Sequence, residues 1–482
     1  MEISFVRRVT LVGLTLVIIL VGAGLAYFGY YGRTPPTTSV TTSNTFISSS
    51  TSTFTSTVSS TTPSSLTPGP GWTTYHRDNS RSGDESSASL NNVSFGWNSA
   101  KLDGLVYAEP LVFGGSVFVA TENNSVYALD ARTGTEQWRT LLGSPVTGSS
   151  LPCGDINPTG ITGTPVIDTS TNTIYVVAFL KPLSHVLVAL DSGTGNIRFK
   201  RGVDPQGANP AVQQQRAALS LANGMVYVPF GGLYGDCGQY HGWVVGISAD
   251  GSGAMISYQV PTTREGGIWA TSGAAIDSAG NVYITSGNGA SSGNFDYGNS
   301  VIKLSPQLEQ LGFFAPSNWL QLNQGDVDLG SVGPTLVGSS ALFQIGKEGV
   351  GYLIDTGAMS GIGSQLFSAK VCSGAYGGTA SSGAYVFVPC TDGLFALHLS
   401  GSAFTLAWKG SGFNAGPPVV TGNWVWSVDV GSGTIHAFNI TDGKELYSHG
   451  LGSVTRFTTP ASGEGRLFVA AGNEIVSFVF SQ

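Results

Sequence analysis

A few side chains suited to metal, proton or stacking chemistry stand out in this chain, because charged residues make up only 10% of it. Many of them fall in irregular stretches between the strands described below, and these are Cys153, Asp155, Asp236, Cys237, Trp269, Asn288, Asp326, Asp328 and Lys347. Carboxylates and an asparagine carbonyl are oxygen ligands that suit Ca²⁺, and an aspartate can also accept a proton. Tryptophan offers a flat stacking surface. Such chemistry requires a fold that gathers these distant residues.

The elements that must position them are short strands, and Pro110–Trp138 shows their pattern most clearly. We expect four strands there, with tight turns containing glycine between them, at Leu111–Phe113, Val117–Thr121, Val126–Leu129 and Thr135–Arg139. A single antiparallel sheet of this size cannot bury its own faces. It therefore needs copies of itself along the chain.

The copies recur at intervals of 40 to 59 residues, and an Ala-Leu-Asp-x-x-Thr-Gly turn recurs with them. The middle strands start near Val117, Ile174, Val226, Val282, Ala341, Ala384, Trp424 and Leu467. Four strands per repeat at this period predict an all-β fold, an eight-bladed β-propeller of four-stranded antiparallel blades. Seven blades would follow if the last unit were only a cap. A two-sheet sandwich is the other alternative, and the recurring turn argues against it.

The strand order decides which face of a propeller carries the long loops. With strands A to D numbered outward from the axis, the A–B and C–D turns lie on one face, and the B–C and D–A connections lie on the other. The long connections Leu142–Ile161, Phe230–Gly242, Gly287–Gly298 and Asn318–Ser331 all belong to the second face, which we call the loop face. Long loops on a rigid scaffold are where binding usually resides.

The ring must also close, and the last unit, Leu467–Phe480, has too few strands for a full blade. Phe95–Leu102 reads as one strand that precedes the first repeat. We expect this N-terminal strand to complete the last blade, because the pairing tethers the two ends of the ring and removes an exposed edge. The propeller is then expected over residues 71–482.

The repeat AEPLVFGGSVFVATENNSVYALDARTGTEQW resembles that of propellers related to pyrroloquinoline quinone (PQQ) enzymes. This PQQ-type family includes quinoprotein alcohol dehydrogenases, which hold PQQ and calcium, and assembly propellers of the BamB kind, which hold neither. The resemblance covers roughly residues 71–482. It is specific for the fold and weak for function, because members with and without a cofactor share it.

The resemblance to quinoprotein dehydrogenases implies a role for six residues. The segment GGIWATSGAAIDSAGNVYITSGNG is similar to one in which a tryptophan lies under the quinone and an asparagine binds calcium, here Trp269 and Asn288. Asp236 falls where the family has a calcium-binding glutamate. GDVDLGSVGP is similar to the stretch with the catalytic base, here Asp326 or Asp328, and IGKEGVGYLID places Lys347 near the quinone carbonyls.

The sequence also departs from that family. Pro152 precedes Cys153, so the pair of adjacent cysteines typical of these dehydrogenases cannot form. The chain contains no Cys-x-x-Cys-His motif for a haem. Each matched residue also has a structural alternative: Trp269 can pack between blades, Asn288 can lie in a turn, the aspartates can cap backbone amides and Lys347 can be a solvated loop residue.

The N-terminal part has a different composition. Residues 1–8 contain Arg7 and Arg8, and Val9–Tyr31 is a run of 23 residues without a charge, long enough to span a bilayer as a helix. This order predicts a transmembrane anchor at residues 9–31 with residues 1–8 in the cytoplasm and the propeller outside. A cleaved signal peptide ending near Ala26 is the alternative. Residues 32–70 are rich in Ser and Thr, and we expect a disordered stalk.

Four cysteines would then lie outside the cytoplasm, where disulfides persist. Cys372 and Cys390 fall in a D–A and a B–C connection on the loop face, so a bond between them is expected. Cys153 and Cys237 are the remaining pair, again on that face.

The composition excludes one class of partner. Net charge is −8 and there is no basic patch, so nucleic acid is not an expected partner. We expect a membrane-anchored module at the cell envelope that binds a protein or a small-molecule ligand at its loop face. The alternative is a dehydrogenase dependent on PQQ and calcium that oxidises an alcohol or a sugar.

Overall fold

The computed structural model describes residues 71–86, 90–410 and 412–481. The predictions for the anchor at residues 9–31 and the stalk at residues 32–70 lie outside the described residues. No helix within the described ranges is long and apolar enough to cross a membrane.

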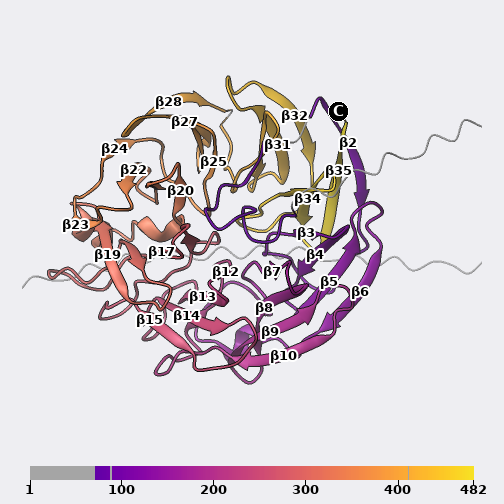
Figure 1. Ribbon diagram of the computed structural model, residues 1–482, viewed down its shortest axis with the longest axis horizontal. Helices are drawn as coiled ribbons and strands as arrows, with labels where there is room; N and C mark the ends of the chain where they lie inside the picture. Colours follow the sequence, from indigo (N-terminus) through magenta and orange to yellow (C-terminus); the bar gives the residue numbers. More distant parts are fainter. Residues whose placement is uncertain (1–70, 87–89, 411, 482) are drawn as a thin grey trace, which may run out of the picture. The chain divides into compact units, whose positions relative to one another are not determined.

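Eight antiparallel sheets stand around one axis, as the sequence predicts, and Figure 1 looks down the ring. The first four blades are formed by β3 (Leu111–Phe113), β4 (Ser116–Ala120), β5 (Ser125–Asp130) and β6 (Glu136–Leu141); β7 (Val166–Asp168), β8 (Thr173–Leu180), β9 (Ser184–Asp191) and β10 (Ile197–Gly202); β12 (Ser220–Ala222), β13 (Met225–Gly232), β14 (Trp243–Ser248) and β15 (Ile256–Gln259); and β16 (Ala275–Ile276), β17 (Val282–Thr285), β18 (Val301–Leu304) and β19 (Gln310–Ala315).

The other four blades follow in chain order and complete the ring. They are formed by β20 (Thr335–Val337), β21 (Ala341–Gln344), β22 (Val350–Asp355) and β24 (Phe367–Lys370); β25 (Ala380–Ser382), β26 (Tyr385–Cys390), β27 (Gly393–Ser400) and β28 (Ala403–Lys409); β29 (Val419–Thr421), β30 (Trp424–Asp429), β31 (Thr434–Asn439) and β32 (Glu445–Gly450); and β33 (Ala461–Gly463), β34 (Arg466–Ala471), β35 (Glu474–Ser481) and β2 (Asn92–Asn98).

The eighth blade confirms the predicted ring closure. Its outermost strand is β2, which pairs antiparallel with β35 from Asn92 opposite Ser481 to Asn98 opposite Val476. The strand begins three residues earlier than the sequence suggested. Blade eight is therefore a full blade made from both ends of the propeller, and the seven-bladed alternative does not apply.

Three blades carry short additions that the repeat pattern did not predict. Strand β23 (Ser360–Ile362) extends the outer edge of blade four, β11 (Gln213–Gln214) pairs with β13 in blade three, and β1 (Asp84–Glu85) pairs with β29 in blade seven. The connection after blade four contains a short helix, α1 (Trp319–Gln324), and a 3-10 turn, η2 (Leu329–Ser331). A second 3-10 turn, η1 (Gly148–Ser150), lies in the connection after blade one.

Neighbouring blades share their hydrophobic core. Between blades two and three, for example, Tyr175 and Val177 pack with Val228 and Val245, all of them buried. Tryptophan docking adds a directed contact at several of these interfaces: the Trp138 indole N–H on the outer strand of blade one donates to Ser192 O in the Asp-Ser-Gly-Thr-Gly turn of blade two, at 3.1 Å. Trp97 and Trp408 make the same contact with the corresponding turns of the next blades. The recurring turn is thus a docking element between blades.

A segment that the sequence left as an irregular entry, residues 71–85, runs along the inner edges of the blades; we call it the axial strap. In Figure 1 it is the indigo chain inside the ring. Innermost strands of five blades donate a backbone N–H to a strap carbonyl at 2.7 to 2.9 Å, and the pairs are Ile167–Thr73, Ile276–Asn79, Leu336–Ser80, Ser381–Ser82 and Val420–Gly83.

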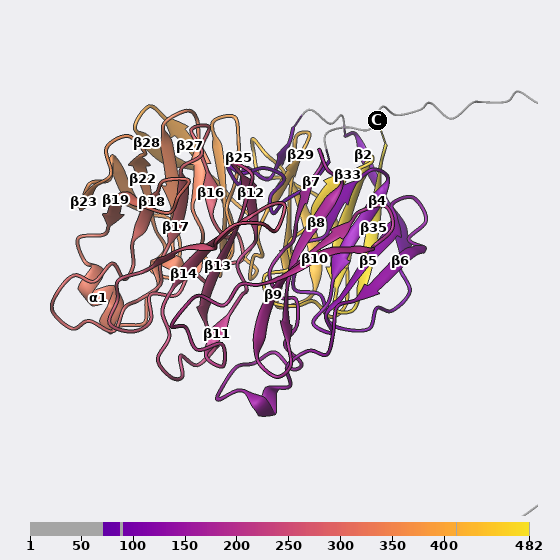
Figure 2. The same ribbon diagram turned by 60° about the horizontal axis from the view of Figure 1, so that its bottom comes forward.

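The strap reaches the other three blades as well. Trp72 pairs with Val112 of blade one, the Asn79 side chain donates to Leu221 O of blade three, and Ser462 of blade eight donates to the Glu85 carboxylate. An innermost strand has a free edge that faces the channel, and the strap satisfies these edges from inside. Figure 2 shows it close to β12, β25 and β29, at the end of the ring away from α1.

Candidate ligand-binding site

The loop face contains a cavity of about 610 Å³ over the propeller axis, which we call the axial cup. Its walls come from B–C and D–A connections of blades three to eight. The residues that line it are Arg216, Gly232, Leu233, Tyr234, Gly235, Asp236, Tyr240, Trp269, Asp326, Asp328, Lys347, Tyr376, Thr391, Asn414, Ala415, Gly416, Val430, Arg456 and Phe457. Five of the six residues selected from the sequence are among them, and Asn288 is not.

Three half-buried aromatic rings gather in the cup. The Trp269 ring centroid lies 6.5 Å from that of Tyr376 and 6.4 Å from that of Phe457, and Tyr376 and Phe457 are 6.4 Å apart. They precede the innermost strands of blades four, six and eight. The buried Tyr75 of the strap bonds through its hydroxyl to Thr459, two residues beyond Phe457, at 3.3 Å. The strap therefore occupies the channel next to this aromatic group.

Lys347 contacts two of the acidic residues that line the cup. Its Nζ is 2.6 Å from Asp328 Oδ2, 3.0 Å from Asp326 Oδ1 and 5.8 Å from the centre of the Trp269 ring. Burial raises the pKa of Asp328 more than Lys347 lowers it, while the two carboxylates outweigh burial and raise the pKa of Lys347. The ammonium therefore remains charged and joins the two aspartates.

Asn288 and Asp236, the two residues that the resemblance assigns to calcium, have different hydrogen-bond partners. The backbone N–H of Asn288 donates to Asp328 Oδ1 at 2.6 Å, so this loop is joined to Asp328 through its main chain. Asp236 accepts a hydrogen bond from the Tyr240 hydroxyl on the blade-three side of the cup. The Asp328–Asn288 contact supports the structural alternative for Asp328, that it caps a backbone amide.

The positions of the carboxylates decide whether they could hold a metal ion together. Across residues 71–86, 90–410 and 412–481, the only place where three acidic, histidine or cysteine ligand atoms lie within 4.8 Å of one another is Cys372, Cys390 and Asp392. Both cysteines there are in a disulfide. Asp236, Asp326 and Asp328 form no such group, so the geometry supplies the stacking surface and the cation for a quinone, while the three carboxylates do not converge on one point.

The cup also contains two arginines that sequence reasoning missed. Arg216 precedes blade three, and Arg456 precedes blade eight and forms an ion pair with Asp155. The Arg456 guanidinium also lies 5.2 Å from the centre of the Tyr234 ring. These residues follow no family motif. Superposing the repeats could have found Arg216, because it lies four residues before β12, as Tyr376 lies four residues before β25.

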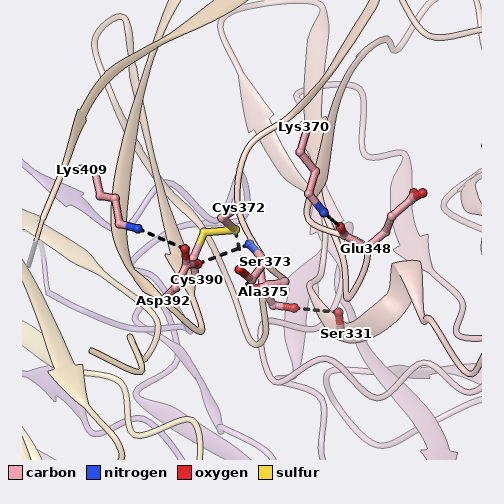
Figure 3. The surroundings of a disulfide bond; sticks show 10 residues. Ser331, Glu348, Lys370, Cys372, Ser373, Ala375, Cys390, Asp392 and Lys409 are labelled. Carbon is pink, nitrogen blue, oxygen red and sulfur yellow. Dashed lines mark hydrogen bonds and ion pairs between the residues drawn. A yellow bond between two sulfur atoms is a disulfide. The ribbon is translucent and has the colours of Figure 1, made fainter. Parts of the chain in front are cut away.

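Both predicted disulfides are present and no described cysteine is free: Cys153–Cys237 and Cys372–Cys390, each with Cα atoms 6.2 Å apart. The first joins two long loops at the rim, next to Tyr234 and Asp236. The second ties the segment before blade six to the end of β26, and Figure 3 shows this bond beside the ion pair between Asp392 and Lys409.

That segment is fixed further by Ser331. The Ser331 hydroxyl donates to Ala375 O at 2.8 Å, and the Ala375 N–H donates to Gly346 O at 3.1 Å. Tyr376 follows directly. The disulfide and these hydrogen bonds therefore position its ring in the cup.

Comparison with known proteins supports the repeat assignment. Residues 75–310 match the family model described as outer membrane protein assembly factor BamB. No curated protein matches the chain. Solved structures with the same fold include the quinohemoprotein alcohol dehydrogenase from Comamonas testosteroni, with a TM-score of 0.65, 15% identity and coverage of 85% of this chain and 80% of that one.

Two further structures are similar in fold. A europium-containing methanol dehydrogenase has a TM-score of 0.66 at 15% identity, over 85% of this chain and 98% of its own. BamB from Moraxella catarrhalis has a TM-score of 0.56 at 16% identity, over 81% of this chain and 99% of its own. These similarities show the fold alone, because two of the structures are named as dehydrogenases and the third is not.

Proposed function

We propose that this PQQ-type β-propeller is a binding module of the cell envelope and that the axial cup is its binding site. The observation that carries the proposal is the cup itself: a concave site of about 610 Å³ that combines an aromatic cluster with polar and charged side chains. Sites for small molecules have this size and this mixture of apolar walls and a few polar groups. A small molecule is therefore the favoured ligand.

Two features support an envelope location. Val9–Tyr31 is uncharged and follows Arg7 and Arg8, the order of an anchor that leaves the remaining chain outside the cytoplasm. All four cysteines are paired, which suits an oxidising compartment. The match to the family model of an outer membrane protein assembly factor supports a second version of the proposal, in which the loop face binds a protein partner.

A dehydrogenase dependent on PQQ is the alternative, and Trp269 and Lys347 are the observations that favour it. Both line the cup, Trp269 as a stacking surface and Lys347 as a cation beside it. In this alternative Asp326 or Asp328 takes the alcohol proton and Asp236 and Asn288 hold calcium. The three aspartates do not form one group of ligand atoms, and Asp326 and Asp328 both contact Lys347. We therefore favour binding without oxidation.

Titration of the purified full-length protein with PQQ, with and without CaCl₂, distinguishes the two functions. The quinone absorption reports binding, and reduction of an artificial electron acceptor with ethanol or glucose reports turnover. We expect no turnover and no dependence of PQQ binding on calcium. Turnover that requires both PQQ and CaCl₂, and that is lost in Asp328→Asn, would establish the dehydrogenase instead.

A further inference from the structure

Arg216 is a cation of the cup whose charge is not taken up by a carboxylate. Within the described residues no Asp or Glu oxygen lies within 4.0 Å of its guanidinium, and one hydrogen bond is formed, from Nη2 to Gln214 Oε1 at 2.9 Å. A guanidinium carries five N–H donors. Arg216 lines the cup, so its remaining N–H donors are available to a ligand bound there.

The other cations of the cup differ from Arg216 in this respect. Lys347 contacts Asp326 and Asp328, and Arg456 forms an ion pair with Asp155. Burial lowers the pKa of Arg216, an effect that Glu122 and Tyr107 oppose, so the guanidinium is held charged in a poorly solvated position. Arg216 is half-buried, and a partly desolvated charge without a carboxylate partner is unfavourable. Here an anionic group from a ligand would remove that cost.

Glu122 is the acidic group that could compete for Arg216. It is buried, its Oε2 accepts the Gly160 N–H at 2.6 Å, and its Oε1 has no hydrogen-bond partner. Burial raises the pKa of Glu122 to about 7, although Gly160, Thr162 and Arg216 oppose this. The other charged or titratable neighbours of this corner are Tyr107 and Arg456. Near neutral pH a large fraction of Glu122 is thus uncharged.

We infer that Arg216 forms an oxyanion subsite of the axial cup, which takes a carboxylate or phosphate group of a ligand held against Trp269. This inference rests on the proposed function and specifies the ligand as a small acidic molecule. The planar fork of arginine matches both groups. Ionised Glu122 competes with the ligand for Arg216, so anions bind more tightly when Glu122 is protonated.

Calorimetric titration of the full-length protein with citrate and, separately, inorganic phosphate tests the subsite at constant ionic strength set with NaCl. We expect wild type to bind at least one of them and Arg216→Gln to bind it at least about tenfold more weakly, the loss expected for charge-assisted hydrogen bonds. Arg132→Gln is the matched control, because Arg132 is an exposed arginine in the C–D turn of blade one, away from the cup.

A second series of titrations varies pH and adds two further variants, so that the inference does not depend on whether Arg216→Gln folds. The affinity of wild type relative to that of Glu122→Gln should fall between pH 6 and pH 8, because the ionisation of citrate and phosphate over this range affects both proteins alike. Arg216→Lys keeps the charge but loses the fork, and it should bind with intermediate affinity. Binding of citrate would indicate a carboxylate ligand, and binding of phosphate would indicate a phosphate ester.

Equal binding by wild type and Arg216→Gln, or no binding of either anion by wild type, overturns the inference. If an uncharged compound nevertheless binds the cup with the same affinity in both proteins, the proposed function stands and only the oxyanion subsite fails.

Discussion

Lys347 Nζ lies 2.6 Å from Asp328 Oδ2 in the axial cup, and the Asp328 side chain is only 6% exposed. Asp328 also accepts the backbone N–H of Asn288, so one carboxylate joins the loop of blade four to the loop of blade five. The pair thereby fixes the rim beside Trp269. Because one member is almost fully buried, removing the other leaves an uncompensated charge in the protein interior.

We predict that Lys347→Met lowers the free energy of unfolding by about 3 kcal/mol, the cost of breaking a buried ion pair. Urea denaturation measures it. Lys409→Met is the control, because the Lys409–Asp392 pair is exposed on both sides and should contribute at most about 1 kcal/mol. Adding Asp328→Asn to Lys347→Met should recover most of the loss. Equal effects of the two lysine substitutions would contradict a buried pair.

The docking turns give a prediction that separates packing from backbone strain. Gly195 has φ +70°, and a Cβ there would lie 2.5 Å from the Trp138 ring. Gly253 has φ +71° with open space around it. Gly195→Ala should cost about 3 kcal/mol, since overpacking adds to the left-handed backbone cost, and Gly253→Ala should cost only about 1 kcal/mol. Thermal denaturation compares them. Similar losses would mean that the docking contact does not matter.

Glu122 gives a prediction on pH. Burial raises its pKa from 4.5 to about 7 in the folded protein. Below pH 4.5 the carboxyl is protonated in both states and has no effect, and as pH rises the unfolded state ionises first, so stability falls until pH passes about 7. Glu122→Gln should remove this loss, an upper limit of roughly 3 kcal/mol by the linkage relation. Unfolding free energies at pH 5, 6, 7 and 8 measure it. Parallel curves for the two proteins would refute the shift.

The axial strap should hold the ring together through Arg81. This side chain is fully buried and donates to Ala274 O, Leu219 O, Tyr75 O and the hydroxyls of Thr74 and Ser220. Arg81→Met should lower stability by about 3 kcal/mol or more, because several acceptors lose their partner. Arg132→Met should be neutral.

Hydrogen exchange provides a second readout for the strap. In Arg81→Met the amides that donate to the strap should lose protection together, and these are Ile167, Ile276, Leu336, Ser381 and Val420. Loss of protection in one blade alone would show that the strap does not act as a unit.

The periodic parts of this protein could be predicted from sequence, and the strap could not. Repeated strands and the docking turn predict a propeller, because each blade needs the same pattern of buried strand residues and the same turn. Ring closure followed from a blade with too few strands, and both disulfides followed from the faces on which Cys153, Cys237, Cys372 and Cys390 lie. The strap bonds through its backbone and through Arg81 to strands far away in the sequence, so no local pattern marks it.

The site was predictable to the extent that it followed a motif. Trp269, Lys347, Asp236, Asp326 and Asp328 do line one cavity. Tyr376, Phe457 and Arg216 each come from a different blade, and their meeting depends on the ring. The resemblance indicated Asp326 or Asp328 as a catalytic base, yet both carboxylates contact Lys347, a pairing that spacing along the chain does not encode.

The claim that the axial cup binds a small molecule is tested most directly by native mass spectrometry. Full-length protein would be incubated with a defined mixture of sugars, organic acids, phosphate esters and PQQ, and the compounds that remain bound would be identified. We predict that wild type and Phe95→Ala, an exposed aromatic on the outer strand of blade eight, retain the same compound and that Trp269→Ala loses it. Retention of nothing by wild type, or of the same compound by Trp269→Ala, would contradict the axial cup as the binding site.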